Sequence, residues 1–170
     1  MNQENTADIL QQYDDQGKPK LPSGLNVLTI LTFIGCAIFG LLTLLMPTIN
    51  KWMLGFMDKA TSSGQELTAK QLADIEKGKA AIELAQQNMI PLMIIGLAGI
   101  ILCFVGALWM RKLKKDGYWM YVAGELAPVL GSFLIMGSAQ YNGVVSVIIG
   151  IGIPVVFVIL YTVQKKYLVK

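Results

Sequence analysis

The sequence has 170 residues, of which 54% are hydrophobic and only 15% are charged. Because soluble domains usually carry charge on about a quarter of their residues, this composition and the long apolar blocks of the sequence indicate a membrane protein. The net charge of +3 comes without a long basic run or interleaved basic and aromatic residues, so we expect no binding to nucleic acid.

Four apolar blocks are each long enough to cross the hydrocarbon layer, about 30 Å thick, as a helix. Backbone polar groups must be hydrogen-bonded inside lipid, so blocks of this length are expected to be helical. The sequence therefore predicts an all-α membrane protein, with a polar cytoplasmic tail over residues 1–24 and a four-helix membrane domain over residues 25–170. We place the crossings at residues 25–46, 89–110, 118–136 and 144–163.

The charges of the connecting loops predict the orientation of these crossings. Residues 111–117 read RKLKKDG, three lysines follow the last block, Lys18 and Lys20 precede the first, and residues 137–143 carry no charge. Basic residues favour the cytoplasmic side, so we expect both termini and the 111–117 loop inside and residues 47–88 outside. Aromatic residues that favour the membrane interface cluster near the predicted cytoplasmic ends: Trp109, Tyr118, Trp119, Tyr161 and Tyr167.

The loop over residues 47–88 is expected to be helical and amphipathic. Ile49, Trp52, Met53 and Phe56 recur at the spacing of one helical face, which is typical of a helix that lies in the outer membrane interface.

A second helix of this loop is predicted to begin at Thr68, because Thr68 and Gln71 have the spacing of a capping box. Apolar residues then recur along one face of it, and we favour packing of this stripe within the chain over binding of a partner. If a partner binds the loop, its candidate face consists of Leu72, Ile75, Ile82, Trp52 and Phe56.

The third block contains a single charged residue, Glu125. On a helical wheel, small and polar residues such as Tyr121 and Ser132 lie near Glu125, which suits a protein interior. The opposite sector is apolar and suits lipid. Glu125 is therefore predicted to face the bundle or a cavity. The members of the apolar sector are Trp119, Val122, Leu126, Leu130, Phe133 and Leu134.

No basic residue lies at the depth of Glu125 in any predicted crossing, and an unpaired carboxyl group in apolar surroundings tends to keep its proton. Our hypothesis is a protonated carboxyl group hydrogen-bonded to Thr29 or Thr32 of the first crossing, with Tyr121 as a further possible partner. The alternative is an ionised Glu125 that borders water or reaches toward the basic loop. These four residues are the candidate functional residues within the membrane.

Two segments, KLPSGLNVLTILTFIGC and RKLKKDGYWMYVAGE, resemble small uncharacterised four-helix inner-membrane proteins of Bacteroidota. The resemblance implies a multi-pass protein of a bacterial inner membrane. It implies no activity, cofactor or catalytic residue.

We expect a non-catalytic accessory or scaffold subunit of a membrane complex rather than an enzyme. The chain has no histidine and no Cys-x-x-Cys, so neither a metal site nor a cofactor is predicted, and Cys36 and Cys103 are expected to be small buried residues. The alternative is an oligomeric small transporter or channel component in which Glu125 binds a proton or a cation. Expected partners are the lipid bilayer and, for a scaffold, another membrane or periplasmic protein or a second copy of the chain.

Overall fold

The computed structural model describes residues 21–63, 67–141 and 143–168, which form helices and short turns with no strand among them. Residues 1–20 of the predicted tail lie outside this part. Four helical stretches are long and apolar enough to cross a membrane, so the prediction of an all-α chain with four such helices is confirmed. The elements are α2 (Ser23–Ser62), α3 (Ala69–Gln87), α4 (Met89–Arg111), α5 (Asp116–Met136), the 3₁₀ turn η1 (Gly137–Tyr141), α6 (Val144–Val147), the π-helical segment η2 (Ile148–Gly152), α7 (Ile153–Gln164) and the 3₁₀ turn η3 (Lys165–Tyr167).

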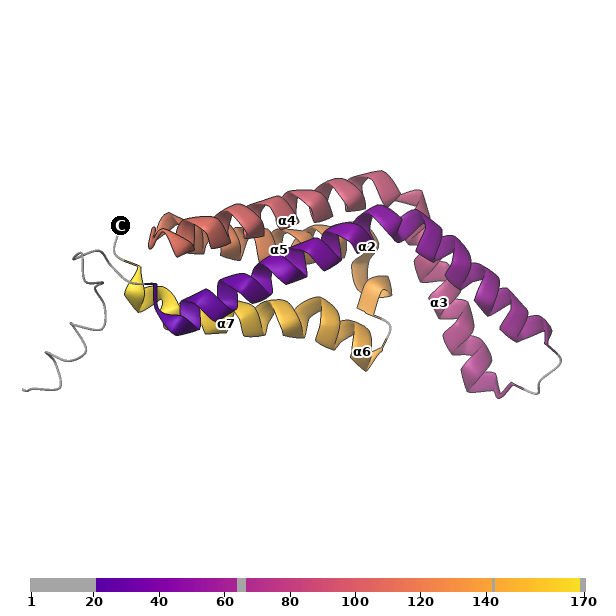
Figure 1. Cartoon of the computed structure of the whole chain (residues 1–170). Helices are drawn as coiled ribbons and strands as arrows, with labels where there is room; N and C mark the ends of the chain where they lie inside the picture. The colour runs from indigo at the N-terminus through magenta and orange to yellow at the C-terminus, as the bar shows by residue number, and fades with distance from the viewer. Residues whose placement is uncertain (1–20, 64–66, 142, 169–170) are drawn as a thin grey trace, which may run out of the picture.

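The first helix, α2, is much longer than a membrane crossing requires. It has 40 residues, so at about 1.5 Å per residue it extends roughly 60 Å, twice the thickness of the hydrocarbon layer. It continues through Pro47, and Figure 1 shows that it changes direction where it leaves the bundle. The predicted separate interfacial helix around Trp52 and Phe56 is therefore wrong as an element. Proline disturbs a single turn, and the residues on both sides of it stay helical.

The predicted start of the second loop helix is confirmed by the cap of α3. The Thr68 hydroxyl oxygen accepts a hydrogen bond of 3.3 Å from the Gln71 amide, and Oε1 of Gln71 accepts one of 2.9 Å from the Thr68 amide. These two bonds complete the capping box and satisfy amides that the first helical turn leaves free.

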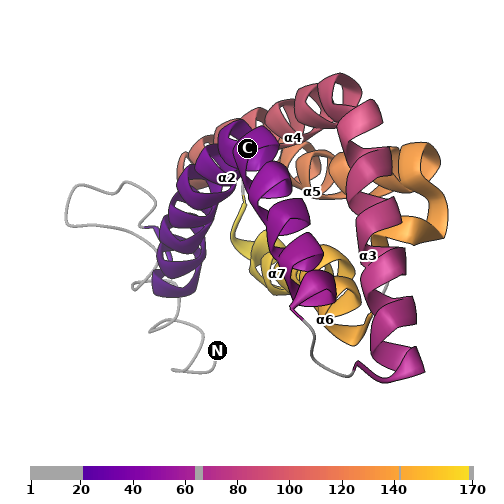
Figure 2. The same ribbon diagram turned by 90° about the vertical axis from the view of Figure 1, so that its right-hand side faces the viewer.

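Helix α3 folds back along the C-terminal half of α2, and we call residues 47–63 and 67–87 the α2–α3 hairpin (Figures 1 and 2). The hairpin projects beyond one end of the bundle. Nζ of Lys79 donates a hydrogen bond of 2.6 Å to Asp58, which joins the two helices. A Cβ atom at Gly78 would lie 2.9 Å from the Met57 methyl group, so this glycine lets the helices approach each other.

Helices α4 and α5 are packed backbone against backbone. A Cβ atom at Gly106 would lie 2.7 Å from the carbonyl oxygen of Gly117, and one at Gly124 would lie 2.7 Å from the amide nitrogen of Cys103. A methyl group at these positions would force the helices apart. Small residues thus let these two helices approach closely, as is usual between membrane helices.

The α4–α5 loop contains a leucine with φ 56°, a conformation in which glycine is usual. The amides of Leu113 and Lys114 bond to the carbonyl oxygens of Met110 and Trp109 and thereby end α4. A side chain in this conformation costs about 1–2 kcal/mol. Only 7% of Leu113 is exposed, and burying a leucine side chain contributes about 1.5–3 kcal/mol, which offsets that strain.

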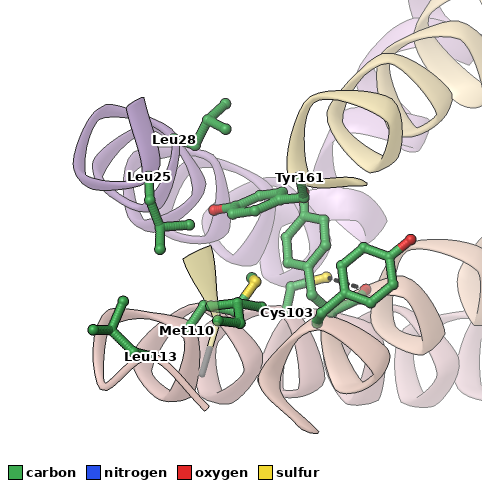
Figure 3. Packing of buried hydrophobic residues seen from close by; sticks show 9 residues of the cluster. Leu25, Leu28, Cys103, Met110, Leu113 and Tyr161 are labelled. Atoms are coloured by element: carbon green, nitrogen blue, oxygen red, sulfur yellow. Dashed lines mark hydrogen bonds between the residues drawn. The ribbon is translucent and has the colours of Figure 1, made fainter. Parts of the chain in front are cut away.

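We call the bundle end that carries Arg111, Lys112, Lys114 and Lys115 the basic end. The cluster of buried apolar residues includes Met110 and Leu113, next to these residues in the sequence (Figure 3). The opposite end, from which the hairpin projects, is the hairpin end. The cluster consists of Leu25, Leu28, Cys103, Met110, Leu113, Tyr118, Tyr121, Tyr161 and Leu168.

The predicted fourth crossing consists of α6, η2 and α7. Hydrogen bonds between hydroxyl groups join it to the bundle at the basic end. The hydroxyl groups of Tyr161 and Thr32 lie 2.8 Å apart, as do those of Thr162 and Tyr118. Toward the hairpin end the crossing becomes π-helical in η2, before Pro154, which has no amide hydrogen to donate. Figure 1 shows α7 diverging from α2 in this direction.

The predicted lipid-facing sector of the third crossing is exposed except at Val122, which is half-buried and packs against the core. Trp119 is 60% exposed and Leu134 is 83% exposed, and Leu130 and Phe133 are exposed as well. Tyr118 and Tyr121, on the predicted inner side, are buried.

Candidate functional site

A cavity of about 360 Å³ lies between α2, α4, α5 and the fourth crossing. Small-molecule sites in proteins usually measure about 300–1,000 Å³. The cavity begins beside the tyrosines of the core and extends toward the hairpin end, where Thr43, Gly96 and Gln140 line it. Its walls are mostly apolar, and Glu125 is the only charged residue among the described residues that line it.

Glu125 is positioned by a tyrosine one helical turn before it. The Tyr121 hydroxyl donates a hydrogen bond of 2.5 Å to Oε1 of Glu125. Tyr121 is 1% exposed, so its ring is held by packing and the hydroxyl is fixed in place. Within the described part of the chain, the second carboxyl oxygen of Glu125 has no hydrogen-bond partner. It is available to a molecule in the cavity that carries a donor.

The predicted hydrogen bond from Glu125 to the first crossing is wrong. The Thr29 hydroxyl donates to the carbonyl oxygen of Asn26 in its own helix, at 2.9 Å. The Thr32 hydroxyl pairs with Tyr161 instead. Both threonines are buried, as expected for an inward face. Neither is available to Glu125, because the Thr29 hydroxyl bonds to its own helix backbone and the Thr32 hydroxyl is paired with Tyr161.

Two tyrosine rings lie at the basic end of the cavity. The ring centroids of Tyr121 and Tyr161 are 4.3 Å apart with the planes tilted by 50°, and both residues belong to the core cluster. Tyr161 is 0% exposed and Tyr118 is 7% exposed, so these two rings, predicted to favour the membrane interface, are instead buried in the core. The Tyr161 hydroxyl is hydrogen-bonded to Thr32 inside the bundle, and this bond favours burial of the ring over a position at the interface.

Basic side chains cover aromatic rings just beyond these tyrosines. Nζ of Lys165 lies 4.8 Å from the ring centroid of Tyr118 and 4.6 Å from that of Trp119, and Nζ of Lys114 lies 5.4 Å from that of Trp109. These cation–π contacts hold lysines at the basic end and outside the cavity.

The two cysteines are free thiols on the walls of the cavity. Sγ of Cys103 lies 3.8 Å from the carbonyl oxygen of Tyr121, and Sγ of Cys36 lies 3.8 Å from that of Ile100. Cys103 is buried and Cys36 is half-buried. Both act here as small residues that fit between helices.

The predicted partner face on the hairpin is divided between two sides. Ile75 and Ile82 are half-buried in the hairpin, whereas Trp52 is 76% exposed and Phe56 is 68% exposed. Leu72 is exposed as well. The stripe on α3 thus packs partly within the chain, and the two aromatic residues of α2 form a separate outward surface.

Three features of the site were missed by sequence reasoning: the inward Tyr161, the lining residue Gln140 and the π-helical segment. Gly150, Gly152 and Pro154 in the fourth crossing were the signal available for the last of these, because closely spaced glycine and proline residues disturb the regular hydrogen bonding of a helix. No protein family, curated protein or solved structure matches this chain.

Proposed function

We propose that the chain is a non-catalytic, multi-pass protein of a bacterial inner membrane that acts as a small carrier or channel component, with Glu125 as the site for a proton or a cation. The observation that supports this function is the cavity: among the described residues, it holds one carboxyl group, with one oxygen free of partners, between the apolar walls of the four predicted crossings. Ionisable residues inside a membrane are costly and usually mark a pathway or a binding site.

The proposed orientation places both termini and the basic end in the cytoplasm. Support comes from the basic residues of the α4–α5 loop and of η3, which lie at the same end of the bundle. Glu125 then lies nearer the cytoplasmic side, and the cavity extends toward the outside. The α2–α3 hairpin projects from the outer surface.

Flux in proteoliposomes tests the carrier function. Purified protein is reconstituted with a pH-sensitive dye inside, and a proton gradient or a Na⁺ or K⁺ gradient is imposed. We expect the gradient to dissipate faster than in protein-free vesicles, and the Glu125→Gln protein to lose the gain. The Glu83→Gln protein, changed at an exposed residue of the hairpin, is the matched control. Equal rates for the wild-type protein, Glu125→Gln and protein-free vesicles in every gradient would contradict the proposal.

A second candidate function is the accessory or scaffold role, with the outward surface formed by Trp52 and Phe56 as the contact with another membrane or periplasmic protein. It is favoured by the exposure of both rings on a hairpin that projects from the bundle, because aromatic residues are enriched at binding hot spots. We expect a stoichiometric companion to co-purify from native membranes with the wild-type chain and to be lost from the double variant Trp52→Ser, Phe56→Ser. A wild-type chain that purifies alone would contradict this role.

A further inference from the structure

We propose that the cavity beside Glu125 binds a lipophilic amine, with the amine nitrogen against the carboxyl group and the apolar body between α2, α5 and the fourth crossing. This inference deepens the proposed carrier function and rests on it, because it names the chemical class of the molecule that the site would take.

The charge of the site selects the head group of the ligand. Among the described residues that line the cavity, Glu125 is the only aspartate, glutamate, lysine or arginine. One carboxyl oxygen already accepts from the Tyr121 hydroxyl, and the other, once Glu125 has given up its proton, needs a donor from the ligand. An amine supplies that donor and the complementary charge. A carboxylate or a phosphate cannot take the proton of Glu125 without leaving a net negative charge in the apolar cavity.

The walls select the body of the ligand. Leu31, Ile100, Val129 and Ile153 line the cavity together with the aromatic ring of Phe157. A molecule that fills about 360 Å³ of such a space must be mostly apolar, since each polar group buried there without a partner would destabilise the complex.

Proton exchange allows such a ligand to bind without carrying a net charge into the membrane. A neutral amine that reaches the cavity can take the proton of the Glu125 carboxyl group. The products are an ammonium group and a carboxylate that face each other, and the total charge of the site is unchanged. A pair with opposite charges is far less costly in apolar surroundings than either ion alone.

The fourth crossing determines how a molecule could reach Glu125. The crossing is bonded to the bundle at the basic end through Tyr161 and Thr162, and there the ring of Tyr121, which lines the cavity, packs against that of Tyr161. Toward the hairpin end, η2 contributes Ile149 and Gly150 to the cavity wall, and π-helical segments are often found at functional sites. Access is therefore expected from the hairpin end.

Calorimetric titration of the protein in lipid nanodiscs tests the ligand class, with empty nanodiscs as the reference. The probes are phenylbutylamine, phenylbutanol and phenylbutyrate, which share a phenyl ring on a chain of three or four methylene groups and differ in the head group. We expect the amine to bind the wild-type protein at least about tenfold more tightly than the alcohol, and Glu125→Gln to remove most of that difference, because a hydrogen bond to a charged group is stronger than one between neutral groups.

Two further variants separate a lost site from a lost fold. Glu83→Gln, on the exposed surface of α3, should bind the amine like the wild-type protein. Ser132→Leu, which fills the cavity without changing Glu125, should weaken the amine and the alcohol alike.

Equal binding of the amine and the alcohol, or tighter binding of phenylbutyrate, would overturn the amine assignment and leave the cavity as a ligand site. If no probe binds and flux still depends on Glu125, the amine assignment alone fails. If no probe binds and flux is also independent of Glu125, the proposed carrier function fails with it.

Discussion

The Tyr121 hydroxyl donates a hydrogen bond of 2.5 Å to Glu125, four residues further along the same helix. This bond lies within α5, so it does not depend on how α2 or the fourth crossing is placed. It uses one carboxyl oxygen and orients the other for the cavity. The carboxyl group in the predicted membrane interior is thus held by its own helix, and the hydroxyl pairs that join the crossings involve other residues.

Substitutions at Glu125 should separate the hydrogen bond from the charge. In Glu125→Gln the side-chain amide oxygen can still accept the Tyr121 hydroxyl, so we expect an unfolding free energy close to that of the wild-type protein. Glu125→Ala leaves that buried hydroxyl unpaired and should cost about 1–3 kcal/mol. Equilibrium unfolding in detergent, followed by circular dichroism, measures both. A Gln protein as unstable as the Ala protein would show that Glu125 stabilises the fold as a charge.

The close packing of α4 against α5 predicts a large effect of a single methyl group. Gly106→Ala should destabilise the bundle by about 1–3 kcal/mol, because the added Cβ atom would contact the backbone of α5 and force the helices apart. Gly40→Ala, where nothing lies within 4 Å of the added atom, is the matched control and should change the thermal unfolding midpoint little. Equal shifts for the two variants would contradict the packing described for α4 and α5.

The cap of α3 should be measurable in the hairpin. Thr68→Ala removes the hydroxyl that accepts from the Gln71 amide and should reduce local helix stability by about 1 kcal/mol. Amide hydrogen exchange is expected to rise in the first turns of α3 and to stay unchanged in α4. A uniform rise through both helices would point to global unfolding rather than to a lost cap.

The proposed orientation predicts which residues an impermeant thiol reagent reaches from outside the cell. With Cys36 and Cys103 first replaced by serine, Ser63→Cys at the hairpin tip should be labelled. Lys114→Cys in the α4–α5 loop should be labelled only after the membrane is opened. The opposite pattern would reverse the topology.

The sequence predicted the features that depend on local spacing. Residue spacing along the sequence was enough to predict the helical crossings, the capping box at Thr68 and the lipid-facing sector around Leu130 and Leu134. This spacing does not depend on which helices pack together. The partners of Thr32 and Tyr161 could not be predicted in this way, because the match between two hydroxyl groups 129 residues apart depends on how the crossings are placed. The same holds for the continuous α2, since packing along both halves decides whether a helix continues through Pro47.

The leucine at position 113 illustrates the same limit. Its position after a basic helix end gave no sign of a left-handed conformation, which is usually associated with glycine or asparagine. The burial of its side chain in the core explains why leucine is tolerated, and that burial exists only in the folded bundle.

Carbodiimide labelling of Glu125 tests the central claim most directly, namely that its carboxyl group is protonated and faces an apolar cavity within the membrane. Dicyclohexylcarbodiimide enters lipid and adds to protonated carboxyl groups, whereas a water-soluble carbodiimide reaches carboxyl groups exposed to solvent. At neutral pH we expect mass spectrometry to find the dicyclohexyl adduct on Glu125, with the water-soluble reagent modifying Glu83 and Asp74 on the exposed surface of α3 instead. Modification of Glu125 by the water-soluble reagent alone would show that its carboxyl group is in contact with water and would contradict its place in an apolar cavity.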